Sequence, residues 1–245
     1  MKTCKIVIRT YLEEGEQMIE FKDVTKIYKN KFTAVENINL KIDEGSFSFI
    51  IGKSGAGKTT LIRLLMKEVE PTSGQIIFNG EDISHLNNRK IPIHRRKIGV
   101  IFQDFRLLEN KTVYENIAFA MEVVGHSSRV IRREIPNVLT MVGLSDKANN
   151  YPNELAGGEQ QRIAIARAVA NKPKVIIADE PTGNLDPETS NDIMKIFKEI
   201  NNRGTTLIMA THDREIVDEM KKRVIELKNG KIIRDTREGE YYNVF

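Results

Sequence analysis

The segment 46–60, SFSFIIGKSGAGKTT, constrains the fold of this chain more strongly than any other stretch. Its first part is a short, largely apolar run typical of a buried strand, and GKSGAGKT at 52–59 fits the pattern G-x-x-x-x-G-K-[ST]. The residues that follow, 58–69, carry apolar side chains at helical spacing. A strand, a glycine-rich loop and a helix in this order predict a phosphate-binding loop in an α/β core, whereas a chance glycine loop would need no such context.

The glycines of this loop let backbone amides approach the β-phosphate of a nucleotide. We expect Lys58 to reach the β- and γ-phosphate oxygens and the Thr59 hydroxyl to bind Mg²⁺. The nucleotide-binding residues predicted in this loop are Gly52, Lys53, Ser54, Gly55, Ala56, Gly57, Lys58, Thr59 and Thr60.

Two other apolar strands end in residues that suit phosphate hydrolysis. VIIADE, at 175–180, ends in Asp179, which we expect to hold Mg²⁺, and in Glu180, which we expect to orient the attacking water. TLIMATHD places His212 where it would hydrogen-bond the γ-phosphate or hold that water. The alternative interpretation is that Asp179 and Glu180 only cap the next turn and that His212 has a structural role.

Gln103 and Tyr28 are weaker candidates when each is taken alone. Gln103 ends the apolar strand KIGVIF and is placed to sense Mg²⁺ and the water. Tyr28 precedes the first long predicted strand and would stack on adenine, but packing in the core or on the surface explains it equally well.

A second glycine pair, in ELAGGEQQRIAIARA at 154–168, also predicts a phosphate contact. Gly157 and Gly158 open a run of helix formers, and a helix N-terminus favours an anion. Two phosphate elements in one chain are explained if two copies meet head to tail, so that the Lys58 loop of one copy and the Gly157–Gly158 segment of the other enclose the same ATP. The sequence therefore predicts a homodimer with two ATP molecules at its interface.

Composition limits the remaining classes of function. The chain has 245 residues, a net charge of +4 and one cysteine, Cys4, so an internal disulfide is excluded and a reducing cytoplasm is expected. No stretch approaches the ~20 apolar residues of a membrane helix, so a membrane role requires a partner. The basic run RKIPIHRRK, at 89–97, is the only hint of nucleic acid, and a solvated face or nearby lipid headgroups explain it more simply.

Taken in order, GKSGAGKT, LAGGEQQR, VIIADEPT, NLD and THD resemble the motifs of ATP-binding cassette ATPases over roughly residues 18–235. The resemblance implies an α/β fold, with a P-loop NTPase core, an N-terminal antiparallel β-subdomain and an inserted α-helical subdomain at about 104–160. It implies that Gln103 joins Thr59 and Asp179 at the metal, that Tyr28 stacks on adenine and that His212 is the switch histidine. The residues implied to contact the nucleotide across the dimer are Leu155, Ala156, Gly157, Gly158, Glu159 and Asp186.

The ends of the chain fall outside this resemblance. Residues 1–17 are expected to be a disordered tail or an extension absent from the native protein, with Met18 as the natural start. Residues 236–245 are expected to form a C-terminal tail.

The segments 102–125 and 171–188 are most similar to the cell-division ATPases of this family. Those ATPases work in bacteria with an integral membrane protein that controls cell-wall hydrolases. The resemblance therefore implies a membrane partner, other division proteins, a place on the cytoplasmic face of the plasma membrane, and no nucleic acid. Side chains expected either to line a groove for the partner's coupling helix or to belong to the core are Phe105, Leu107, Leu108 and Tyr114.

Ala156 departs from the family pattern, which usually has serine at this position. That serine hydroxyl reaches the γ-phosphate across the dimer, so we expect a weaker or slower ATP-bound dimer that is still competent, by roughly a factor of three to ten. Three alternative functions stay open. They are a transport ATPase, a nucleic-acid-acting or ribosome-acting cassette, and a scaffold with negligible turnover, although Glu180 argues against the last.

Overall fold

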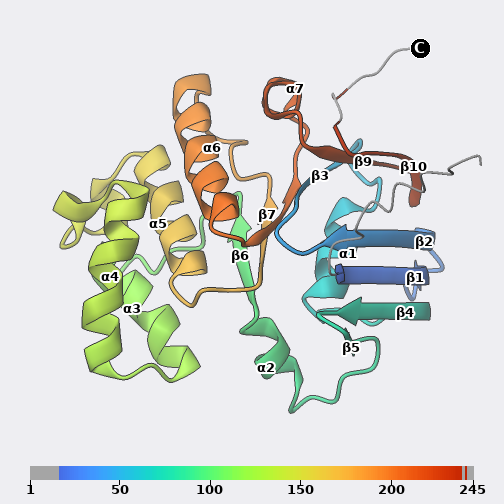
Figure 1. Cartoon of the computed structure of the whole chain (residues 1–245), viewed down its shortest axis with the longest axis horizontal. Coiled ribbons are helices and arrows are strands. Elements are labelled where there is room, and N and C mark those ends of the chain that lie inside the picture. Colours follow the sequence, from blue (N-terminus) through green and yellow to red (C-terminus); the bar gives the residue numbers. More distant parts are fainter. Residues whose placement is uncertain (1–16, 239–240, 242–245) are drawn as a thin grey trace, which may run out of the picture.

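The computed structural model describes residues 17–238 and residue 241 (Figure 1). The expectations for residues 1–16, 239–240 and 242–245 lie outside these residues. Gln17, which we assigned to the extension, begins the first strand and pairs with Asp43. Thr236, which we assigned to the tail, ends the last strand. No helix within the described part of the chain is long and apolar enough to span a bilayer.

The elements follow the order expected of an α/β protein. The strands are β1 (Gln17–Ile27), β2 (Thr33–Asp43), β3 (Phe47–Ile51), β4 (Ser73–Phe78), β5 (Glu81–Asp82), β6 (Ile98–Phe102), β7 (Val175–Asp179), β8 (Thr206–Ala210), β9 (Arg223–Lys228) and β10 (Lys231–Thr236). The α-helices are α1 (Lys58–Leu65), α2 (Ile91–Arg95), α3 (Val113–Val124), α4 (Ser128–Val142), α5 (Gly157–Val169), α6 (Pro187–Asn202) and α7 (Arg214–Met220). Two short 3₁₀ turns, Ser145–Lys147 and Pro152–Glu154, precede α5.

Within residues 17–238, ten strands form two sheets. The larger one has the order β10-β9-β3-β8-β7-β6, in which β9, β3, β8, β7 and β6 run parallel and β10 lies antiparallel on one edge. The smaller sheet, β2-β1-β4-β5, is antiparallel. Hairpins form at Asn79–Gly80 and at Asn229–Gly230, where an Asn-Gly pair tolerates the positive φ angles that such turns need.

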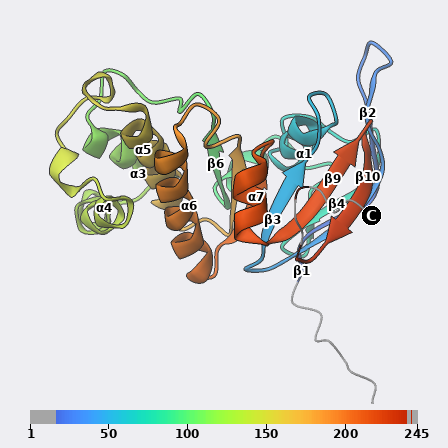
Figure 2. The ribbon, with the colours of Figure 1, turned by 90° about the horizontal axis from the view of Figure 1, so that it is seen from above.

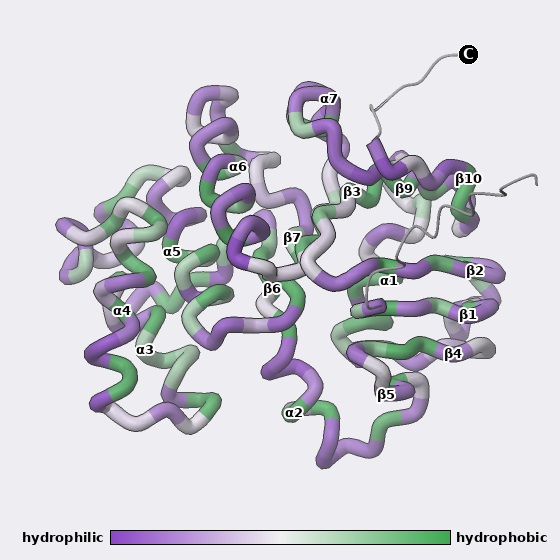
Figure 3. The backbone as a smooth tube through the Cα atoms, in the orientation of Figure 1, coloured by the Kyte–Doolittle hydropathy of each residue, from purple (hydrophilic) through white to green (hydrophobic). Residues whose placement is uncertain are grey.

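The strands of the larger sheet bury both faces, as their continuous apolar sequences predict. In β8, Leu207 and Met209 pack into one hydrophobic core, while Ile208 and Ala210 pack into a second. The first core lies against helices α3 to α7, and the second lies between the two sheets, where α1 is placed (Figure 1). Hydrophobic colour accordingly follows inner strands such as β7, whereas α7 is mostly hydrophilic (Figure 3).

The helices α3, α4 and α5 gather on one side of the molecule, opposite the smaller sheet (Figures 1 and 2). They lie in the region where the sequence predicts a helical insertion. Helix α4 is continuous through Pro136. Helix α5 extends to Val169 and contacts both β6 and α6, so the helical part continues into the core beyond residue 160.

The basic run at 89–97 has a structural explanation. His94 donates through Nε2 to the carbonyl of Leu65 at 2.6 Å, and Arg95 donates to Met66 and Lys67 carbonyls at 2.9 and 3.1 Å. These carbonyls belong to the C-terminal end of α1, where the last turn of a helix lacks intrahelical donors and attracts positive charge. Two members of the run therefore cap α1, and burial lowers the pKa of His94.

Candidate active site

The carboxyl ends of four parallel strands meet around one cavity of about 1180 Å³. Strand β3 leads into the glycine loop, β6 into Gln103, β7 into Asp179 and Glu180, and β8 into His212. All of these residues line the cavity, together with the whole loop 52–60. Carboxyl ends of neighbouring parallel strands share one edge of a sheet, which is why residues so far apart in the sequence come together.

The glycine loop is shaped to expose bare backbone to the cavity. A Cβ atom at Gly52 would lie 2.4 Å from the carbonyl oxygen of Leu227, and one at Gly57 would lie 2.8 Å from that of Ala34. Gly57 is the N-cap of α1, and no side chain caps its amides. Lys58 extends across the loop and donates to the carbonyl of Gly52 at 2.6 Å. Uncapped helix amides beside a lysine are suited to hold the phosphates of a nucleotide.

Asp179 and Glu180 form the acidic side of the cavity, and His212 lies beside Glu180. Burial and the adjacent Glu180 carboxylate raise the pKa of Asp179, while the positive charges of Lys58 and Arg106 oppose this shift. A carboxylate in such a place is stabilised by a cation, so Asp179 and the nearby Thr59 hydroxyl fit Mg²⁺. In the described residues, no group of three His, Cys, Asp or Glu side chains could hold a metal, so phosphate oxygens and water would complete its coordination.

Glu180 is held in an unusual conformation. Its φ angle is 54°, in the left-handed region that non-glycine residues rarely adopt. Its amide donates to the carbonyl of Ala210 at 2.9 Å, and its carboxylate contacts Nδ1 of His212. The strained backbone and this contact together hold the carboxylate at the cavity wall.

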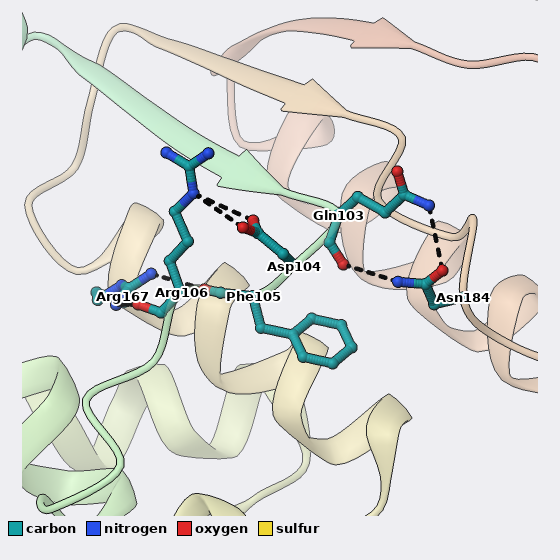
Figure 4. Close-up of polar contacts among 6 residues, drawn as sticks. All are labelled: Gln103, Asp104, Phe105, Arg106, Arg167 and Asn184. Carbon is teal, nitrogen blue, oxygen red and sulfur yellow. Dashed lines mark hydrogen bonds and ion pairs between the residues drawn. The ribbon is translucent and has the colours of Figure 1, made fainter.

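Gln103 is fixed by a residue that the sequence did not single out as a partner. Its side-chain amide donates to Oδ1 of Asn184 at 3.1 Å, and Asn184 donates to the carbonyl of Gln103 at 3.3 Å (Figure 4). Both residues line the cavity. This reciprocal pair joins the end of β6 to the segment that leads into α6.

Several predicted nucleotide residues do not line this cavity. Tyr28 lies in the turn between β1 and β2 with the Lys26 ammonium 5.4 Å from its ring, and the cavity is lined instead by Phe32 at the other end of that turn. Residues 155–159 and Asp186 also lie elsewhere. Asp186 is the N-cap of α6, where it accepts from the amide and the hydroxyl of Thr189 at 2.9 and 2.6 Å.

The start of α5 has only one of the two hydrogen bonds of a capping box. Ala156 is its N-cap residue and has no side-chain cap, while its amide donates to Oε2 of Glu159 at 3.0 Å. Gly158 abuts α6, since a Cβ atom there would lie 2.3 Å from Cγ2 of Thr189. Gly158 thus serves the packing between α5 and α6.

Eight residues that line the cavity were not among the predicted site residues: Phe32, Ala34, Phe102, Asp104, Arg106, Asn184, Arg214 and Tyr241. Phe32 had a detectable signal, since it is an aromatic residue in a polar turn beside the expected Tyr28. Asn184 is the first residue of the NLD motif, but no role of its own was predicted for it. The others lie in a strand, next to a motif or in the tail, where no pattern marks them.

Comparisons with known proteins agree with this geometry. The family model described as ABC transporter matches residues 35–183. Cell division ATP-binding protein FtsE of Bacillus subtilis is 53% identical over 224 residues, covering 91% of this chain and 98% of the relative. FtsE of Mycobacterium tuberculosis is 54% identical over 225 residues, with 91% and 98% covered, and FtsE of Escherichia coli is 46% identical over 213 residues, with 87% and 96% covered.

Solved structures give the same result. CbiO1 of Clostridium perfringens, part of the ABC transporter complex CbiONQ, superposes with a TM-score of 0.86 at 30% identity and covers 91% of this chain and 89% of its own. The ATP-binding cassette MJ0796, solved as a dimer in a post-hydrolysis state with ADP and Pi, has a TM-score of 0.81 at 36% identity and covers 91% and 100%.

The chain therefore belongs to the ABC transporter family of ATP-binding cassettes, which confirms the predicted family and fold. It is an ATPase that uses ATP and Mg²⁺. Its curated relatives are the bacterial cell division ATP-binding proteins FtsE. The dimeric state of MJ0796 supports homodimerisation of this chain.

Proposed function

We propose that this chain is the ATP-hydrolysing subunit of a complex of the FtsE–FtsX type, which drives an integral membrane partner that regulates cell-wall hydrolysis during bacterial cell division. The observation that carries the proposal is the convergence of the glycine loop, Gln103, Asp179–Glu180 and His212 on one cavity, in a chain whose relatives are named FtsE. The complex would lie on the cytoplasmic face of the plasma membrane.

Each side chain of the cavity has a proposed role. The amides of residues 52–60 and Lys58 bind the triphosphate. Thr59, Asp179 and Gln103 hold Mg²⁺, which neutralises phosphate charge when bound. Glu180 accepts the proton of the attacking water, and His212 holds this carboxylate in place through the contact of its Nδ1.

The dimer follows from the residues that lie outside the cavity. Residues 155–159 lead into the first turn of α5, whose N-terminal amides are available to an anion, yet they do not line the cavity of their own chain. A second copy placed head to tail brings this helix start and Asp186 toward the nucleotide of the first copy. ATP then joins the two copies, and hydrolysis releases them.

A second cavity, of about 480 Å³, is the proposed docking site of the membrane partner. It lies between the segment 92–100, α3 and the end of α5, and its apolar wall includes Leu108, Phe119 and Val123. Phe119 and Val123 are 43% and 61% exposed, which is unusual for two large apolar side chains of one groove. Of the other groove candidates, Leu107 and Tyr114 pack against the main hydrophobic core. An amphipathic helix of the partner suits this groove.

The test is to trap the complex by removing the water-activating carboxylate. Glu180→Gln is expressed in native cells, the membranes are isolated with ATP present, and the membrane protein that copurifies is identified by mass spectrometry. Recovery of an FtsX-like protein with a large extracytoplasmic loop supports the proposal. A solute permease or exporter subunit would overturn the cell-division role and keep the ATPase, and ribosomes or nucleic acid without a membrane protein would overturn both.

A matched pair of variants tests the groove in the same experiment. Val123→Glu places a charge in the groove and is expected to abolish copurification of the partner while ATP binding is unchanged. Ile233→Glu is the control because Ile233 is also apolar and 53% exposed, but lies on β10, away from the groove. Equal loss of the partner in both variants would contradict the assignment of the groove.

A further inference from the structure

The loop that follows Gln103 has a backbone conformation that its own sequence disfavours. Phe105 and Arg106 are successive non-glycine residues in the left-handed region, with φ angles of 54° and 51°. In this region the Cβ atom crowds the backbone, so isolated non-glycine residues are uncommon there and two in succession are rarer still. Interactions from outside the loop must therefore hold this turn.

Arg167 supplies such interactions from α5. One terminal nitrogen of its guanidinium, Nη1, donates to the carbonyl of Arg106 at 2.5 Å, and the other, Nη2, donates to the carbonyl of Phe105 at 2.9 Å (Figure 4). A planar guanidinium presents its donors in a fixed fork, which matches two adjacent carbonyls that point the same way. The left-handed turn is what makes these two carbonyls available to one side chain.

The charge of Arg167 is used for this contact rather than for an ion pair. Across residues 17–238, no carboxylate lies within ion-pair distance of its guanidinium. The side chain is half-buried, and burial lowers its pKa from the ordinary value, although a guanidinium stays charged in proteins. A half-buried cation that contacts two carbonyls of one turn makes that turn costly to rearrange.

The rest of the loop is anchored at its two ends. Gln103 is bonded to Asn184 at the cavity, and the buried Asn116 of α3 accepts from the amide of Leu108 at 2.9 Å and donates to its carbonyl at 3.1 Å. Arg167 therefore holds the middle of a segment whose first residue lines the nucleotide cavity. The side chain of Arg106 also reaches this cavity, 3.6 Å above the ring of Phe102.

We propose that Arg167 is a positioning residue for Gln103. By binding the carbonyls of Phe105 and Arg106 it fixes the turn that keeps Gln103 at the cavity, and it makes the position of that turn depend on α5. The inference rests on the proposed function in one respect, because it takes Gln103 to act on Mg²⁺ and the attacking water. The contact between Arg167 and the turn does not depend on that role.

The first test measures hydrogen exchange of backbone amides in the full-length chain. Arg167→Met is expected to speed exchange at 104–107, where the amide of Arg106 donates to the carbonyl of Asp104, and to leave the loop 52–60 unchanged. Arg162→Met is the matched control because Arg162 lies on the same helix and donates to the carbonyl of Val142 at 2.9 Å. The control is expected to affect the end of α4 and, through the ion pair of Arg162 with Asp192 at 3.5 Å, α6, but not residues 104–107. Unchanged exchange at 104–107 in Arg167→Met would overturn the proposal.

The second test separates positioning from general stability through kinetics. Misplacement of Gln103 is expected to lower kcat of Arg167→Met by ten- to hundredfold, with the KM for ATP within about twofold of wild type because the glycine loop is untouched. Arg167→Lys keeps the charge but lacks the planar guanidinium, so its kcat is expected to lie between those of wild type and Arg167→Met. The lysine variant also serves as the test if Arg167→Met does not fold. A kcat no lower than that of Arg162→Met would refute the role.

The two proposals fail in different ways. If the wild-type chain has no FtsX-like partner, both the exchange data and the kcat comparison still decide the role of Arg167. If Arg167→Met shows faster exchange at 104–107 but a normal kcat, the contact holds the turn without positioning Gln103, and the inference is wrong while the proposed function stands.

Discussion

Ala156→Ser is the substitution whose effect the structure predicts most fully. Ala156 is the N-cap of α5 with φ −66° and ψ 158°, a conformation that suits serine. Its amide already donates to Glu159 at 3.0 Å, so half of a capping box is present. A serine hydroxyl would accept from the amide of Glu159 and complete the box. A serine N-cap is worth about 1 kcal/mol over alanine, which raises the Tm of a chain of this size by about 2–4 °C.

In the proposed head-to-tail dimer the same hydroxyl would contact the nucleotide of the other copy. One neutral hydrogen bond contributes about 0.5–1.5 kcal/mol, so ATP-driven dimerisation should strengthen about three- to tenfold. Ala156→Gly separates the two effects, because glycine caps a helix almost as well as serine but has no hydroxyl. We expect the glycine variant to gain Tm without gaining affinity for its second copy.

The assays are differential scanning fluorimetry without nucleotide and analytical ultracentrifugation with ATP in the Glu180→Gln background. If Ala156→Ser and Ala156→Gly strengthened the dimer equally, the hydroxyl would have no contact with the nucleotide. If neither changed the Tm, the assignment of Ala156 as an uncapped N-cap would be wrong.

Three further predictions follow from other sites. Because the pKa of Asp179 is raised, the chain loses stability as the pH rises from the unfolded-state pKa of this carboxyl through its folded-state pKa. Asp179→Asn should therefore raise the Tm without nucleotide at neutral pH. The same substitution should abolish the increase in Tm that Mg-ATP produces. The lowered pKa of His94 means that stability is lost as the pH falls below about 6.5, and His94→Gln should show a shallower fall in a pH series of thermal melts. Gly158→Ala should cost about 1–3 kcal/mol by overpacking against Thr189, and chemical denaturation should show Thr189→Ser restoring part of it, whereas an equal loss in the double variant would exclude that contact.

The residues that the sequence predicts well are those that follow a buried parallel strand. The glycine loop, Gln103, Asp179, Glu180 and His212 each end such a strand, and the geometry of parallel sheets brings strand ends together whatever the sequence between them. Their roles in catalysis stay predictions, although the cavity that they share is present.

The residues that could not be predicted depend on contacts between distant segments. Whether Tyr28 or Phe32 lines the cavity is decided by the path of one short turn, and both are aromatic residues with equal local signals. The basic run gave no sign that His94 and Arg95 cap α1, which ends more than twenty residues earlier in the sequence. Arg167 sits in an unremarkable helical pattern, and its importance appears only where the turn at Phe105 meets it.

The bond between Asn184 and Gln103 has a consequence for how two ATP molecules would be used. Gln103 lines the cavity proposed to hold the nucleotide of its own chain, and the segment after Asn184 leads through Asp186 to Thr189, which packs on Gly158 at the start of α5. In a head-to-tail dimer that helix start serves the other nucleotide. Each chain would therefore connect the two nucleotides through a short series of direct contacts. Release of phosphate from one site would then weaken nucleotide binding at the other. Hydrolysis would then depend on ATP concentration more steeply than in a single-site enzyme, with the two halves acting as a pair.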